Sequence, residues 1–108
     1  MVNLLEGITP VLEKDAQKYN RLRWWAGLTL GDILDRAADI HPEKEAFVDG
    51  RTRLTYQETR DIADRLAIGL IKRGINPLDR VLLQLPNWNE FVYSYFALQK
   101  IGAIPVLL

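Results

Sequence analysis

The chain contains no cysteine, a single histidine (His41) and a single serine (Ser94) in 108 residues. Without cysteine, neither a disulfide framework nor a thiolate metal site can form, and a reducing compartment is compatible with the sequence. One histidine cannot supply a metal-binding pair of histidines. Ser94 lies inside a stretch of helical length and not on the strained turn that a nucleophilic serine occupies. The cysteine, histidine and serine arrangements that often carry hydrolytic or metal chemistry are therefore missing.

The chain also has no charge excess, no long apolar run and no glycine-rich phosphate loop. Fourteen basic residues balance fourteen acidic ones, so the composition gives no general attraction to nucleic acid or to anionic membranes. No apolar run approaches the roughly 20 residues that span a bilayer, and the N-terminus does not resemble a secretory signal. We therefore expect a cytoplasmic protein that binds neither nucleic acid nor membrane. We assign no catalytic, cofactor-binding or metal-binding residue.

Residues 1–28 are predicted to form an arm ahead of the main domain. Thr9 and Pro10 can cap and begin a short helix. The run at 18–25, KYNRLRWW, interleaves basic and aromatic side chains, a mixture that can bind single-stranded nucleic acid by stacking and phosphate contact. Because the chain as a whole has no net charge, we favour the alternative that these aromatic side chains pack the arm onto the domain.

Two amphipathic helices are predicted over residues 29–40 and 55–73. Each begins with a capping box, in which a threonine and an acidic residue three positions later bond to each other's backbone amides. The two pairs are Thr29 with Asp32, and Thr55 with Glu58. Apolar residues recur on one face of each helix, which predicts that both pack against a common core.

A β-hairpin is predicted between these helices, over residues 45–56. Two short segments suited to strands flank Asp49-Gly50, which is a strong turn signal. Asp49 is interpreted as a turn residue and not as a metal ligand.

Residues 80–108 are predicted to fold as a strand, a helix and a second strand. The two continuous apolar segments, 80–85 and 104–108, are typical of parallel strands buried on both faces. Asn87 is expected to cap the helix over 88–101. That helix is apolar around most of its circumference, which indicates burial on several sides.

A domain of 108 residues has few layers with which to cover such a helix. The predicted fold class is therefore α/β, as the N-terminal fragment of a larger fold. It contains a short hairpin, amphipathic helices and a βαβ unit that starts a parallel sheet. Residues 1–28 are the arm, and residues 29–108 are a partial α/β subdomain.

Short motifs along this subdomain resemble a known family. In order they are LTYQE at 54–58, ADRLA at 63–67, KRGI at 72–75, DRV at 79–81, LPN at 85–87, FAL at 96–98 and GAIP at 102–105. This ordered set resembles the N-terminal region of adenylate-forming enzymes, which include acyl- and aryl-CoA synthetases, luciferases and peptide-synthetase adenylation domains. Tyr19, Trp24-Trp25 and residues 28–34 further resemble the start of aryl-acid AMP ligases of the 2,3-dihydroxybenzoate type. Thr59 departs from the leucine that this family often has there.

The resemblance implies a parent enzyme that activates a carboxylic acid, here an aryl acid, with ATP and Mg²⁺ as an acyl-adenylate. The acyl group then passes to a thiol of CoA or of a carrier protein. The family's phosphate loop, ribose-binding aspartate, acid pocket and C-terminal lysine have no counterpart in these residues. The chain alone is therefore expected to bind none of these cofactors and to be inactive.

The expected partner is the remainder of the parent enzyme, and self-association through the uncovered sheet edge and the apolar helix is also expected. The alternative is a non-enzymatic module that binds a partner protein through the apolar face of helix 88–101.

Overall fold

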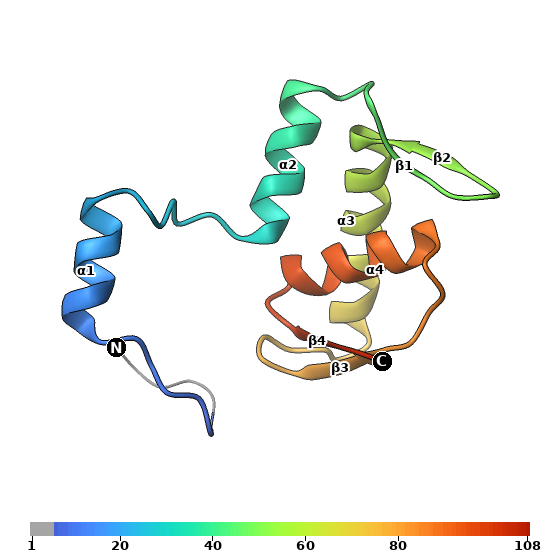
Figure 1. Ribbon diagram of the computed structural model, residues 1–108. Coiled ribbons are helices and arrows are strands. Elements are labelled where there is room, and N and C mark those ends of the chain that lie inside the picture. The colour runs from blue at the N-terminus through green and yellow to red at the C-terminus, as the bar shows by residue number, and fades with distance from the viewer. Residues whose placement is uncertain (1–5) are drawn as a thin grey trace.

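The computed structural model describes residues 6–108, so the first five residues of the predicted arm lie outside the described residues. The elements, in order, are α1 (Glu13–Arg21), α2 (Leu30–Ile40), β1 (Glu45–Val48), β2 (Arg53–Thr55), α3 (Tyr56–Lys72), β3 (Arg80–Leu83), α4 (Asn89–Lys100) and β4 (Ile104–Leu107). In Figure 1, α2, α3, α4 and the strands form one body, and α1 lies apart from it beyond an extended linker. The predicted α/β class, with its hairpin, amphipathic helices and βαβ unit, is confirmed.

The helix of the arm begins later than predicted. Leu12 is extended and occupies the N-cap position of α1, and its carbonyl accepts a hydrogen bond from the amide of Ala16. No side chain caps this helix, so the prediction that Thr9 does so is wrong. Glu13 and Asp15 place negative charge in the first turn, where it suits the helix dipole.

The aromatic side chains of the arm pack on one another. The ring of Tyr19 lies 5.5 Å from that of Trp24 and 5.1 Å from that of Trp25. Trp24 stays 65% exposed, and α1 has no extensive packing against another element of the described chain. The interpretation that these side chains pack the arm onto the domain is therefore wrong for residues 6–108.

Both predicted capping boxes are present. Thr29 Oγ1 accepts from the amide of Asp32 at 3.1 Å, and Asp32 Oδ2 accepts from the amide of Thr29 at 2.9 Å. Thr55 and Glu58 repeat this arrangement at the start of α3, with the same two distances. Gly74, just after α3, has a φ of +95°, which a side chain would strain.

The core lies where α2, α3 and α4 meet (Figure 1). Its buried apolar side chains are mostly small: Leu34, Ala38, Ala63, Ala67, Leu83, Ala97, Leu98 and Ala103. Small residues let helix backbones approach closely, so α3 and α4 make the most extensive contact between elements. Thr59 is fully buried among them, and its hydroxyl donates to the carbonyl of Thr55 at 2.8 Å. This bond satisfies the buried hydroxyl of Thr59.

Helix α4 is covered better than the length of the chain led us to expect. Each of its residues is buried or half-buried, because α2, α3 and the strands β3 and β4 lie against it, and single side chains of the hairpin also reach it. Phe47 of β1, for example, lies 6.3 Å from Phe96 between ring centroids. Asn87 does not cap this helix, because Trp88 occupies the N-cap position without a side-chain bond.

The uncovered surface belongs to the small parallel sheet. β3 and β4 pair in parallel register, Arg80 with Ile104 through Leu83 with Leu107, whereas β1 and β2 form a separate antiparallel pair. Leu83 is buried beside α4, but Leu82 is 61% exposed. Burial of these strands on both faces is therefore not achieved within this chain. No helix within residues 6–108 combines the length and the apolarity needed to cross a membrane.

Candidate functional site: the junction of the hairpin and helix α4

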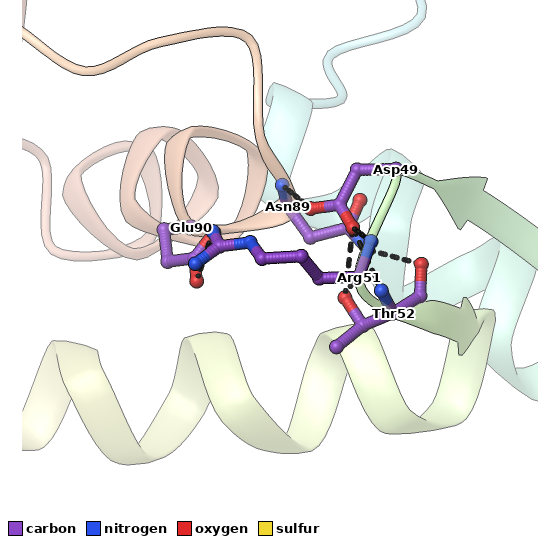
Figure 2. Close-up of polar contacts among 5 residues, drawn as sticks. All are labelled: Asp49, Arg51, Thr52, Asn89 and Glu90. Carbon is purple, nitrogen blue, oxygen red and sulfur yellow. Dashed lines mark hydrogen bonds and ion pairs between the residues drawn. The ribbon is translucent and has the colours of Figure 1, made fainter.

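The densest polar network of the described chain joins the hairpin turn to the start of α4. Figure 2 shows Asp49 between its own turn and Asn89, the first residue of α4. Asp49 Oδ1 accepts from the amides of Arg51 and Thr52, both at 2.7 Å. Asp49 Oδ2 accepts from the amide of Asn89 at 2.8 Å. One carboxylate therefore organises a tight turn and also caps a helix that begins 40 residues later.

These hydrogen bonds set the charge state of Asp49. The amide of Asn89, followed by those of Arg51 and Thr52, lowers the pKa of the Asp49 carboxyl from 3.8 to about 2, although partial burial acts in the opposite direction. Each amide stabilises the ionised form, because a carboxylate accepts hydrogen bonds better than a carboxylic acid does. The positive end of the α4 dipole adds to the same effect.

Two further contacts hold the junction. The buried amide of Asn89 donates through Nδ2 to the hydroxyl of Thr52 at 2.7 Å and to its carbonyl at 3.1 Å. Arg51 Nη2 lies 2.9 Å from both carboxylate oxygens of Glu90, and its guanidinium lies 4.2 Å from the ring centroid of Trp88. The hairpin is thereby fixed over the N-terminal end of α4, as Figure 2 shows.

The polar groups of this junction stabilise the fold, and their acceptors are not available for a reaction. Every acceptor of Asp49 that faces the turn or α4 is already engaged by a backbone amide. Within residues 6–108, no group of three or more histidine, cysteine or acidic side chains could hold a metal ion. The prediction of Asp49 as a turn residue is confirmed. Its role as the cap of α4 was missed, because no local motif connects residues so far apart in the chain.

A second charged cluster lies at the other end of α4. Lys100 Nζ donates to Asp35 of α2 and to Asp64 of α3, so one cation ties three helices together. The Lys100 side chain is 12% exposed. Partial burial lowers its pKa, but the two carboxylates outweigh this effect and raise it. Gly31 leaves room for this side chain, since a Cβ there would lie 2.9 Å from Lys100 Cγ.

The two other residues considered for chemistry do not come together. His41 is an exposed residue at the C-cap of α2, whereas Ser94 lies in the middle of α4. The basic and aromatic run over 18–25 has Lys18 Nζ at 5.8 Å from the ring centroid of Trp24. Apart from the residue types of this run, nothing in the described chain favours nucleic-acid binding, and the chain has no excess of positive charge.

The fold and the comparisons define the class of protein. The family model of AMP-binding enzymes matches residues 34–108, well over half of the chain. The chain therefore belongs to the AMP-binding enzyme family, as the ordered motifs between 54 and 105 indicate.

Particular relatives include aryl-acid ligases. The chain is 45% identical over 103 residues to a 2,3-dihydroxybenzoate-AMP ligase of Bacillus subtilis (strain 168), covering 95% of this chain and 19% of that protein. It is 47% identical over 104 residues to triostin synthetase I of Streptomyces triostinicus, and the match covers 96% of this chain and 20% of that protein. The apo structure of MbtA from Mycobacterium smegmatis matches with a TM-score of 0.91 at 40% identity, covering 99% of this chain and 21% of that one. The chain thus spans about a fifth of the length of the relatives it matches.

Proposed function

We propose that this chain is the N-terminal scaffold of an AMP-forming ligase that activates an aryl carboxylic acid as an acyl-adenylate and transfers it to a thiol. The observation that carries the proposal is the 45% identity to a 2,3-dihydroxybenzoate-AMP ligase over 95% of the chain. The fold supports it, because residues 6–108 supply helices and a pair of parallel strands but no group of histidine, cysteine or acidic side chains that could hold a metal ion.

Within this proposal, the reaction takes place on the remainder of the enzyme. ATP and Mg²⁺ are the expected substrate and metal, but residues 6–108 offer no ligand set for Mg²⁺. No catalytic step is therefore assigned to any residue of this chain. Its contribution is to hold α4 and the parallel strands in place, through Asp49 at one end of α4 and Lys100 at the other. A cytoplasmic location, where ATP is supplied, is part of the same proposal.

The scaffold role is preferred to a non-enzymatic interaction module. That alternative requires a free apolar face on the helix at 88–101. Each residue of α4 is instead buried or half-buried by the rest of the chain. The four most exposed apolar side chains lie on the arm and at the parallel sheet: Leu12, Trp24, Leu82 and Leu108.

A chimera tests the scaffold role. The matched segment of the Bacillus subtilis ligase is replaced by this chain, and ATP–pyrophosphate exchange is measured with a panel of carboxylic acids. We expect exchange with 2,3-dihydroxybenzoate from the chimera and none from the 108-residue chain alone. Ala97→Asp should abolish folding of the chimera, because Ala97 is fully buried. Ile68→Asp, at a residue 53% exposed, is the matched control and should be tolerated. A chimera that fails to fold, or exchange by the chain alone, would overturn the proposal.

A further inference from the structure

The arm makes no extensive contact with the body of the molecule, and its own residues contact one another. After α1, the amides of Trp24 and Trp25 both donate to the carbonyl of Tyr19, at 2.9 and 3.3 Å. Arg23 has a φ of 58°, which turns the chain so that both indole rings return to Tyr19. The linker that follows contains Gly27 with a φ of +71°. The end of α1 and the two indole rings are therefore held together by contacts within the arm.

One side of this unit is apolar and carries large exposed side chains. Helical spacing places Leu12, Ala16 and Tyr19 on one face of α1, where Ala16 is buried and Tyr19 is half-buried. Leu12 is 61% exposed, and Trp24 and Trp25, which extend this face, are 65% and 42% exposed. The opposite face is hydrophilic, and its residues line a shallow hollow: Lys14, Gln17, Lys18 and Arg21. Large exposed aromatic side chains grouped on one side mark a contact surface.

The comparison with MbtA indicates what covers that surface. The model of the AMP-binding family begins at residue 34, so the arm lies outside it. The MbtA structure nevertheless matches 99% of this chain with a TM-score of 0.91. A score this high requires the arm, about a quarter of the chain, to occupy the same position relative to the body. In this chain α1 does not pack extensively on the body. The four fifths of the MbtA chain outside the match are therefore the available support.

We propose that the face formed by Leu12, Tyr19, Trp24 and Trp25 is a clamp that docks on the part of the ligase polypeptide outside this 108-residue segment. This inference rests on the proposed scaffold function. The clamp adds a second attachment, distant from the parallel sheet, by which the N-terminal segment holds the rest of the enzyme. Lys14 and Arg21, on the opposite face of α1, remain in solvent.

The test compares one pair of substitutions in two settings. Trp24→Ala/Trp25→Ala is made in the 108-residue chain and in the chimera with the Bacillus subtilis ligase. In the chain alone, we expect the Tm of the body to be unchanged, since the arm does not rest on it. In the chimera, we expect the Tm to fall by roughly 3 °C or more, because an anchored contact is lost. Lys14→Ala/Arg21→Ala is the matched control and should leave both values unchanged.

Proteolysis of the linker at 26–28 provides an independent measurement. Cleavage should be rapid in the chain alone, at least about tenfold slower in the chimera, and rapid again in the chimera with the tryptophan substitutions. Two outcomes would overturn the clamp: equal effects of the tryptophan and control pairs, or equal cleavage in the chain and in a folded chimera. A chimera that does not fold even with the unaltered arm would instead count against the scaffold function itself.

Discussion

A single carboxylate, that of Asp49, connects two elements that are distant in sequence. It organises the hairpin turn and caps α4, a helix whose own N-cap residue, Trp88, makes no side-chain bond. Unsatisfied amides at a helix start are costly when buried, and Asn89 is buried. The ionised form of Asp49 therefore contributes to the placement of α4 against the hairpin, together with Thr52 and Arg51.

The stabilisation by Asp49 should disappear in acid. Its carboxyl has a pKa of about 2 in the folded chain and 3.8 as the ordinary value. A lowered folded pKa contributes stability above the ordinary value, and this contribution is lost as the pH falls towards the folded one. Asp49→Asn should lower the urea midpoint at neutral pH. The difference in urea midpoint between Asp49→Asn and the parent chain should then narrow as the pH falls from about 4 towards about 2.

The control for this measurement is Glu43→Gln, which removes one exposed acidic charge just ahead of the hairpin. The urea midpoint of Glu43→Gln should differ little from that of the parent chain at neutral pH. If Asp49→Asn and the parent chain differed by the same amount at every pH, the cap would owe its effect to shape and not to charge.

At the scale of the element, the two capping boxes are the clearest link from sequence to structure. Thr55→Ala should cost about 1 kcal/mol of the free energy of unfolding, because it leaves the amide of Glu58 without its partner at the start of α3. Thr9→Ala is the matched control: the sequence around Thr9 resembles a cap, but α1 begins after Leu12 without any side-chain cap. Urea denaturation gives the free energy of unfolding of both variants. Equal losses for Thr55→Ala and Thr9→Ala would contradict the assignment of the caps.

Elements with local signals could be predicted from the sequence, and those fixed by distant partners could not. Thr29, Thr55 and the Asp49-Gly50 turn act within a few residues of themselves, so their roles follow from spacing alone. The capping of α4 by Asp49 depends on tertiary placement, and Asn87 was the wrong local candidate. The packing of Trp24 and Trp25 on Tyr19 likewise depends on a turn at Arg23 that no motif announces. The candidate site was missed for the same reason.

At the scale of the whole molecule, one apolar part of the parallel sheet is left exposed to solvent. It has only β3 and β4, and its exposed apolar residues are Leu82, Val106, Leu107 and Leu108, at 61%, 42%, 53% and 76%. Parallel strands are normally buried on both faces. Two free strand edges also present unpaired backbone groups to any neighbouring strand. In the proposed ligase, the rest of the polypeptide covers this surface.

The isolated chain should therefore self-associate through the parallel sheet. Leu82 pairs with Val106 in the register, so a charge at Val106 enters the exposed apolar face directly. Sedimentation over a range of concentrations should show association of the parent chain, and Val106→Lys should shift it towards the monomer. Ile68→Lys changes charge equally at a residue that is 53% exposed on α3, a helix with no extensive contact with β3 or β4, and should leave association unchanged. A parent chain that stays monomeric at high concentration would show that the sheet tolerates water without cover. Equal effects of both lysine substitutions would show that net charge, and not this surface, controls association.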